Sequence, residues 1–238
     1  MVKNEDDIIE EMIRNLVAEG VDQVLVADNM SSDRTREIVE RLSSELPVHL
    51  VIDPVPQYWQ AEKMSHLARS ATRMGASWIV PCDADELWRG NSGRSIADVL
   101  RSSNADVVEA SWWNYAPIAS NDASTCASRF PYRESAADSQ IKVAFRANWL
   151  SRVTQGNHNV TVPGSRRSTG LRIAHYRFRS PAQMLRKAND GAAATRLAGL
   201  RDLPQWSQLE GSSTEAAAAL MQRLTSAETL VYDPSADW

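Results

Sequence analysis

The sequence is poor in cysteine, which excludes several kinds of small, cross-linked protein. Only two of its 238 residues are cysteines, Cys82 and Cys126, and they lie far apart in the chain. Two distant cysteines provide neither a disulfide framework nor a cysteine metal cluster. We therefore expect a reducing, cytoplasmic compartment, with Cys82 buried as a small apolar residue.

Long apolar runs and a strong excess of one charge are also missing. No stretch approaches the roughly 18–20 apolar residues of a membrane-spanning helix, and the polar segment from Lys3 to Asp7 does not resemble a secretory signal. The formal net charge of −4 argues against nucleic-acid binding through bulk positive charge. We expect a globular protein with one large domain or two small ones, no transmembrane segment and no nucleic-acid partner.

Helical and strand-like patterns alternate over the first hundred residues. Helical spacing of apolar residues, or short apolar runs typical of strands, are found in turn at 6–19, 21–27, 33–45, 48–52, 60–75, 77–83, 95–103 and 105–114. This order predicts a parallel α/β sheet covered by helices on both faces. The polar stretch 116–140 is too long for a simple connection, so we interpret it as a functional or poorly ordered loop. Strands are expected at 141–147 and 171–179, and helices from Ser180 onward.

Three carboxylates follow a predicted buried strand in "IVPCDADELW". Asp83, Asp85 and Glu86 fall within four positions, and ligands of parallel α/β sheets bind at the carboxyl ends of strands. Unpaired carboxylates this close repel each other, and a divalent cation such as Mg²⁺ or Mn²⁺ removes the conflict. Such an ion commonly binds through one or two carboxylates plus phosphate oxygens, so the cluster suggests a metal–phosphate site. The alternative is a solvated acidic turn that caps the next helix.

A second acidic motif gives this cluster a context. "VADNMSSDRT" places Asp28 at the end of another predicted strand, where its local role is turn and helix-cap chemistry. The segment resembles the D-N-x-S-x-D-x-T element of nucleotide-sugar glycosyltransferases. Together with "KNE" at 3–5 and "DADE" at 83–86, it resembles family 2 glycosyltransferases of the GT-A fold over about residues 2–110. The likeness resumes in "LRIAHYRFRSPAQMLRKA" at 171–188.

The resemblance implies a metal-dependent enzyme that moves a sugar, with inversion, from a nucleotide-diphosphate donor to an acceptor hydroxyl. It implies Mn²⁺ or Mg²⁺ as cofactor, because a divalent metal stabilises charge on the leaving diphosphate. Asp85 is the expected direct metal ligand, and Asp83 is expected to bind the metal through water, or to bind the ribose. Asn4, Glu5 and Asp28 are expected near the nucleotide, although Glu5 is equally well read as a carboxylate at a helix N-terminus.

The second half of the chain supplies further candidates. The resemblance implies that His175 is another metal ligand, although a lone histidine on a strand is usually structural. Arg177 and Arg179 would then help to hold the diphosphate, because guanidinium matches phosphate geometry. His158, in "TQGNHNV", is either an acceptor-side residue of the kind found in relatives or an ordinary loop residue.

The catalytic base is not identified by the sequence. Inverting transfer requires a base within hydrogen-bond reach of the acceptor hydroxyl. The acidic candidates are Glu86, Glu109, Glu134 and Asp138. Glu134 lies in the irregular loop, a reasonable position for an acceptor lid, and we take Asp85, Glu86 and Glu134 as the catalytic set. Trp88, Trp112 and Trp113 are candidates for a sugar-stacking wall, but core packing is the better explanation for each.

The chain departs from the family pattern at its start. Relatives begin with an apolar strand directly before K-N-E, whereas only Met1 and Val2 precede Lys3 here. That strand is central in this fold, so its truncation would leave two neighbouring strands without a partner and buried backbone groups unsatisfied. We expect a start codon assigned too late or a trimmed chain rather than a degenerate protein, because the motif after the gap is intact.

The predicted organisation has three parts: a nucleotide-sugar-binding half at 1–110, an acceptor-binding half of the same domain at 111–179, and a helical extension at 180–238 that packs on the domain. The expected partners are the donor, a glycan or lipid-linked acceptor and, peripherally, a membrane surface; relatives commonly build surface polysaccharides. One alternative is an inactive transferase that serves as a binding or scaffold module. A phosphatase with a D-x-D motif is disfavoured because Leu87 stands where Thr or Val is usual. A nucleotidyltransferase would need a Gly-rich opening loop, which is missing.

Overall fold

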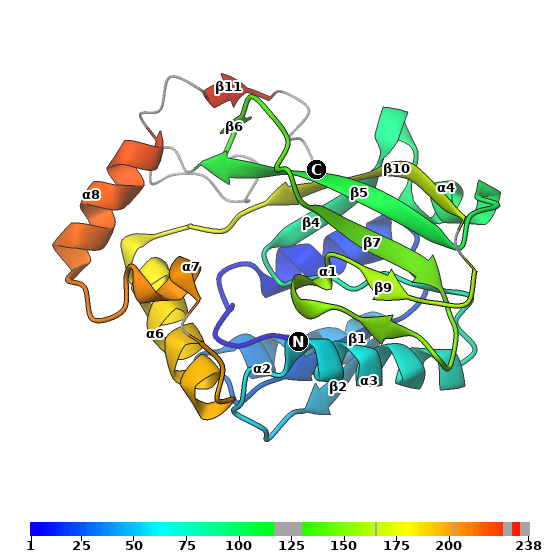
Figure 1. The fold of residues 1–238 in the computed structure, drawn as a ribbon, viewed down its shortest axis with the longest axis horizontal. Helices are drawn as coiled ribbons and strands as arrows, with labels where there is room; N and C mark the ends of the chain where they lie inside the picture. The colour runs from blue at the N-terminus through cyan, green and yellow to red at the C-terminus, as the bar shows by residue number, and fades with distance from the viewer. Residues whose placement is uncertain (117–129, 165, 202, 226–229, 234–238) are drawn as a thin grey trace. The chain divides into compact units, whose positions relative to one another are not determined.

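The computed structural model describes residues 1–116, 130–164, 166–201, 203–225 and 230–233 (Figure 1). The chain forms two compact units. Unit 1 comprises Met1–Pro54, Gln60–Trp112 and Ala137–His175, and unit 2 comprises Val55–Trp59, Trp113–Ala136 and Tyr176–Trp238. Cys126 and most of the irregular loop at 116–140 lie outside the described residues. The predicted division of the chain into parts at 1–110, 111–179 and 180–238 stays a prediction.

Unit 1 is a mixed α/β structure, which confirms the predicted fold class. Its helices and strands, in chain order, are α1 (Ile9–Ala18), β1 (Val24–Asp28), α2 (Thr35–Glu45), β2 (Val48–Ile52), α3 (Gln60–Arg73), β3 (Trp78–Ile79), β4 (Glu86–Gly90), η1 (Asn91–Gly93), α4 (Ile96–Ser102), β5 (Val107–Ala116, whose last residues belong to unit 2), β7 (Ile141–Arg146), β8 (Arg152–Val153), η2 (Gln155–Asn157), β9 (Val160–Thr161) and β10 (Arg167–His175). Most of the expected elements appear within a few residues of their predicted bounds.

The strands of unit 1 form separate sheets rather than the single parallel sheet that we expected. β1 and β2 pair in parallel from Val24↔Val48 to Asp28↔Ile52. In the larger sheet, β3 pairs with β7, β7 with β5, and β10 with β4, all antiparallel. Among the described residues no strand lies between β1 and β3, and Val2 contributes only an isolated parallel bridge to Asp28.

Two further strands correct the sequence-based assignment. Residues 86–90 form β4, not a turn that caps a helix, and the strand pairs with β10 from Glu86↔His175 to Gly90↔Leu171. In the tail expected to be helical, Leu230–Tyr232 forms β11. Both are short strands whose partners are distant in sequence, so local periodicity carries little information about them.

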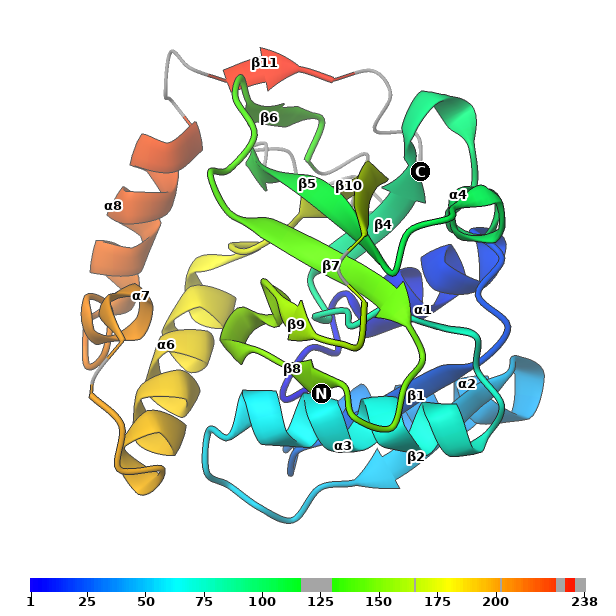
Figure 2. The ribbon, with the colours of Figure 1, turned by 45° about the vertical axis from the view of Figure 1, so that its right-hand side comes forward.

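Apolar helix faces cover the sheets of unit 1. α1 buries Ile9, Met12, Ile13 and Leu16. Met64 and Ala68 of α3 join a core cluster with Val107, Val143 and Phe145 from the sheet. Figure 2 shows α3 alongside the β8–β9 hairpin, with which it is in contact.

Unit 2 contains β6 (Tyr132–Glu134), β11, α6 (Pro181–Leu197), α7 (Pro204–Ser207) and α8 (Thr214–Thr225). α6 begins with a cap at Ser180, whose hydroxyl accepts a hydrogen bond from the Gln183 backbone, followed by Pro181 in the first turn. Unit 2 has a small apolar core formed by Met184, Ala188 and Leu209. No helix in the described part of the chain is long and apolar enough to cross a membrane.

Candidate functional site

Two of the three clustered carboxylates share one buried lysine. Lys142 of β7 has 2 % of its side chain exposed, and its Nζ lies 2.7 Å from Asp83 Oδ2 and 2.8 Å from Glu86 Oε1. Glu86, the first residue of β4, is fully buried. An ammonium group between two carboxylates offsets their repulsion. An internal cation therefore explains much of the crowding of like charges in "DADE".

The pKa values in this trio follow from burial and from the two ion pairs. Burial alone would raise the pKa of Asp83, but Lys142 holds it below its usual value. Burial raises the pKa of Glu86, and Lys142 offsets this only in part. Burial would lower the pKa of Lys142, yet the two carboxylates raise it well above its usual range. Lys142 is thus a permanent positive charge inside unit 1.

Neutral donors complete the surroundings of Asp83 and Glu86. Asp83 Oδ1 accepts hydrogen bonds from Asn157 Nδ2 (3.0 Å) and Gln60 Nε2 (3.2 Å). Glu86 Oε2 accepts from Trp88 Nε1 (3.0 Å) and from the Asp83 backbone N–H (3.2 Å). Asp83 and Glu86 are therefore held by protein groups, and both bind the "DADE" turn to the sheet.

Asp85 is directed to a different partner, His175. The pairing of β4 with β10 places His175 opposite Glu86, and His175 Nε2 lies 3.6 Å from Asp85 Oδ2. Both side chains are largely buried, with 5 % of Asp85 and 11 % of His175 exposed. The structure thus brings together two of the three predicted metal ligands, while Asp83 is engaged by Lys142.

An aromatic stack connects His175 to the lysine. The Trp112 ring of β5 stacks on His175 with centroids 4.7 Å apart and an interplanar angle of 14°. Lys142 Nζ lies 5.1 Å from the Trp112 ring centroid, and His158 meets the same ring edge-on at 5.7 Å. His158 Nδ1 lies 2.9 Å from the Ile141 carbonyl oxygen, and burial lowers the His158 pKa. Trp112 therefore orients both histidines, and Trp88, fully buried, is a core residue.

The two N-terminal motifs hold each other in place. The Asn4 backbone N–H donates to Ser31 Oγ (3.0 Å), and Asn4 Oδ1 accepts from the Ser32 N–H (2.8 Å). The Glu5 N–H donates to Thr35 Oγ1 (2.8 Å). Asn4 has a left-handed backbone, with φ of 55°, which asparagine tolerates better than most residues. Hydrogen bonds thus connect the "KNE" and "DNMSSDRT" segments to each other. Asn4 makes two of these bonds, a structural role that the sequence did not indicate.

Asp28 is the last residue of β1 and is 3 % exposed. Its Oδ1 is buried and has no hydrogen-bond partner among the described residues. A buried carboxylate oxygen without a donor is costly. The role of Asp28 toward a base N–H or a ribose hydroxyl stays a prediction.

The remaining predicted site residues are divided between the units. Glu109 pairs with Arg167 at 2.8 Å in unit 1. Asp138, also in unit 1, is half-buried and its backbone N–H donates to the Trp112 carbonyl oxygen at 2.9 Å. In unit 2, Glu134 accepts from Asn114 Nδ2 at 3.0 Å.

The two predicted phosphate-binding arginines also belong to unit 2. Arg179 is 6 % exposed and donates to the Tyr176 carbonyl oxygen. The Arg177 guanidinium lies over the Phe178 ring. Their roles toward a diphosphate stay predictions.

Unit 1 offers few protein ligands for a divalent cation. The described residues contain no cluster of three or more His, Cys, Asp or Glu side chains able to hold a metal. Asp85 and His175 supply two ligands of suitable chemistry, and sites of this class take their remaining ligands from phosphates and water. The residues therefore fit a cation that binds together with a diphosphate, rather than one enclosed by protein ligands alone.

Sequence reasoning missed Lys142, Asn157 and Gln60. Lys142 lies in the strand-like run "IKVAFRA", where a single lysine is ordinarily read as solvent-facing. One signal was available: a charged residue within a run otherwise buried on both faces requires a partner of opposite charge. No local sequence pattern indicates that Asn157 or Gln60 contacts Asp83.

Comparisons with known proteins agree with the motifs. The model of the family "Glycosyl transferase family 2" matches residues 1–151. No curated protein matches the sequence. Among solved structures, S. aureus TarS 1–349 in complex with UDP is 12 % identical, with 95 % of this chain and 70 % of that chain covered and a TM-score of 0.44. The mannosyltransferase PcManGT from Pyrobaculum calidifontis, in complex with GDP-Man and Mn²⁺, is 17 % identical, with 95 % and 74 % covered and a TM-score of 0.49.

The family match extends over more than half of the chain and includes all three motifs of the first hundred residues. Both TM-scores are below 0.5, so membership rests on the sequence match. This chain belongs to glycosyl transferase family 2 and is a glycosyltransferase.

Proposed function

We propose that unit 1 binds a nucleotide-diphosphate sugar with a divalent cation and transfers the sugar, with inversion, to an acceptor hydroxyl. The observation that carries this proposal is the pairing of Asp85 with His175 at the junction of β4 and β10. Mn²⁺ or Mg²⁺, held by these two residues, would neutralise charge on the leaving diphosphate. We extend the proposal to a cytoplasmic reaction that contributes to surface polysaccharide, as the family resemblance implies.

Three other side chains of unit 1 have proposed roles in binding and orienting the donor. Asp28 would accept a hydrogen bond from the base or ribose through its unpartnered Oδ1. Lys142 keeps Asp83 and Glu86 neutralised and in position, so that Asp85 is the carboxylate directed at the ligand. Trp112 fixes the ring plane of His175.

Among the four base candidates, Asp138 is the one that this geometry favours. Glu86 is fully buried and held by Lys142 and Trp88, which leaves it no route to an acceptor hydroxyl. Asp138 is half-buried, and its backbone is bonded to Trp112, the residue stacked on His175. We expect Asp138→Asn to lower kcat about 10²-fold, as for loss of a general base, with unchanged nucleotide affinity. Glu134→Gln is the matched comparison. A larger loss of kcat in Glu134→Gln than in Asp138→Asn would identify Glu134, and not Asp138, as the general base.

The proposal is tested first by binding. Mn²⁺ is titrated calorimetrically into the full chain in the presence of UDP or GDP, and each nucleotide is titrated without metal. Metal-dependent binding of either nucleotide supports a donor site. Absence of binding by the folded protein, with no turnover of nucleotide sugars, would instead favour an inactive binding module.

A substitution at Asp28 tests the nucleotide side separately. Asp28→Asn keeps the shape but replaces the charged acceptor, and hydrogen bonds to charged groups contribute roughly 1.5–3 kcal/mol. We therefore expect nucleotide affinity to fall by about 10- to 100-fold, without a loss of stability, because Oδ1 has no protein donor to lose. Unchanged affinity would exclude Asp28 from the site. Asp98→Asn, on the exposed face of α4, is the control.

A further inference from the structure

The turn between β7 and β8 exposes two large apolar side chains. Trp149 is 54 % exposed, and the adjacent Leu150 is 71 % exposed, the highest value among the large apolar residues of the described chain. Asn148 orders the turn: its side-chain oxygen accepts from the Leu150 N–H, and its carbonyl oxygen accepts from the N–H and the hydroxyl of Ser151. The two apolar side chains are therefore presented to solvent by an ordered turn, and their burial against a partner would be favourable.

One side of α3 lies against this turn. The Ser65 hydroxyl accepts from the Val153 N–H at 2.9 Å, and two turns later the Arg73 guanidinium lies 5.6 Å from the centroid of the Trp149 ring. Figure 2 shows α3 running alongside β8, with which it is in contact. Helix positions four apart lie on the same side, so Arg69 lies between these two contacts.

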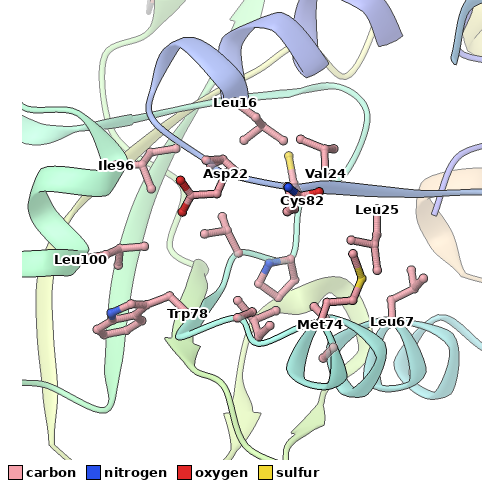
Figure 3. Close-up of a pocket in the computed structure, with 18 of the residues that line it drawn as sticks. Leu16, Asp22, Val24, Leu25, Leu67, Met74, Trp78, Cys82, Ile96 and Leu100 are labelled. Atoms are coloured by element: carbon pink, nitrogen blue, oxygen red, sulfur yellow. The ribbon is translucent and has the colours of Figure 1, made fainter. Parts of the chain in front are cut away.

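The opposite side of α3 faces the interior of unit 1. Leu67 of α3 and Met74, the residue after the helix, line an apolar cavity of about 510 Å³. Figure 3 shows both side chains pointing toward Leu25 of β1. The helix therefore has an apolar inner side and a basic outer side, on which Arg73 is exposed and Arg69 is half-buried.

Three arginines around the turn have no carboxylate partner. Arg69, Arg73 and the exposed Arg152 of β8 form no ion pair with any residue that the structure describes. Arg41 of α2, in contrast, contacts two glutamates. Glu62 lies in the first turn of α3, at the other end of the helix. The chain as a whole has a net charge of −4, so the unpaired positive charge is a local feature of this surface.

We propose that this surface, which consists of Arg69, Arg73, Trp149, Leu150 and Arg152 and is called the Trp149 surface below, docks on an anionic lipid membrane. Lipid phosphates match the geometry of guanidinium groups, and tryptophan is favoured at the boundary between headgroups and acyl chains. A projecting turn suits a fluid bilayer, because a protein partner needs a complementary surface of roughly 800 Å². The proposal does not depend on the donor site.

The test measures binding of the full chain to lipid vesicles in the absence of nucleotide sugar. Vesicles of phosphatidylcholine alone are compared, by flotation at low and high salt, with vesicles that also contain phosphatidylglycerol. We expect binding to the anionic vesicles only, weakened by salt, because the attraction of basic side chains to a charged lipid surface is screened. Equal binding to both kinds of vesicle, or binding to neither, would overturn the proposal.

Two matched pairs of variants locate the contact on the protein. Arg73→Gln should lower the partition coefficient about 5-fold, the effect of one basic residue near the lipid surface. Arg36→Gln makes the same change in charge at a paired position on α2 and should have little effect. Leu150→Ser should lower partitioning about 10-fold through lost apolar burial, whereas Val51→Ser, at a 40 % exposed position of β2, should not. Equal losses within either pair would overturn the assignment of this surface.

Fluorescence quenching separates insertion from attraction at a distance. Vesicles that carry bromine on their acyl chains quench a tryptophan that enters the bilayer. We expect quenching in the unmodified chain and its loss in Trp149→Phe, a variant that still binds the vesicles. Quenching that persists in Trp149→Phe would place another part of the chain in the membrane and overturn the proposal. Self-association that is lost in Leu150→Ser, in a chain that binds no vesicles, would overturn it by assigning the surface to a second copy.

Discussion

Replacement of Lys142 by methionine is expected to lower the free energy of unfolding by about 3–5 kcal/mol, the loss typical of a buried ion pair broken on one side. Methionine keeps most of the apolar stem but leaves Asp83 and the fully buried Glu86 without the cation that lies within 2.8 Å of both. Chemical denaturation of the variant and the unmodified chain, monitored by tryptophan fluorescence, measures the difference.

Two further variants separate charge from packing in this prediction. In Lys142→Met the carboxylates of Asp83 and Glu86 have lost their cation. Adding Glu86→Gln removes one of these two negative charges, so the double variant should be more stable than Lys142→Met alone. Arg41→Met is the matched surface control, because Arg41 also contacts two carboxylates, those of Glu10 and Glu45, but in an exposed position. We expect little change there, since exposed ion pairs contribute little. Equal losses for Lys142→Met and Arg41→Met would show that Lys142 does not carry the charge balance of the cluster.

The second large effect is expected from Asp85→Ala. Removal of this carboxylate should abolish metal-dependent nucleotide binding and lower kcat/KM about 10³-fold, comparable to the loss of one strong electrostatic stabiliser. The fold should persist, because Asp83 and Glu86, not Asp85, pair with Lys142. Calorimetric titration of Mn²⁺ with UDP or GDP measures binding, and turnover of the nucleotide sugar that binds measures catalysis.

The controls for Asp85→Ala distinguish ligation from general charge. Asp85→Asn keeps the size of the side chain but removes its charge, so it should bind Mn²⁺ weakly. Asp98→Asn removes an exposed carboxylate of α4 and should bind and react as the unmodified chain does. Metal-dependent binding that survives in Asp85→Ala would show that the cation is held elsewhere, and the role proposed for His175 would fail with it.

The sequence alone determined the elements whose signals are local. The apolar spacing of α1 and α3 and the run "VHLVI" of β2 indicate secondary structure from neighbours a few residues apart, and the observed bounds agree closely. The motifs "KNE", "DNMSSDRT" and "DADE" were sufficient to indicate the family.

Only the tertiary structure decided how the charges of the site are balanced. Lys142 lies 59 positions after Asp83, and β7 brings it between two carboxylates by pairings that no local pattern encodes. The register of β4 against β10 likewise decides that Asp85, and not Asp83, faces His175. The physical reason is that propensity and periodicity act over one or two turns of chain, whereas a buried charge must be neutralised by whichever residue the completed sheet places beside it.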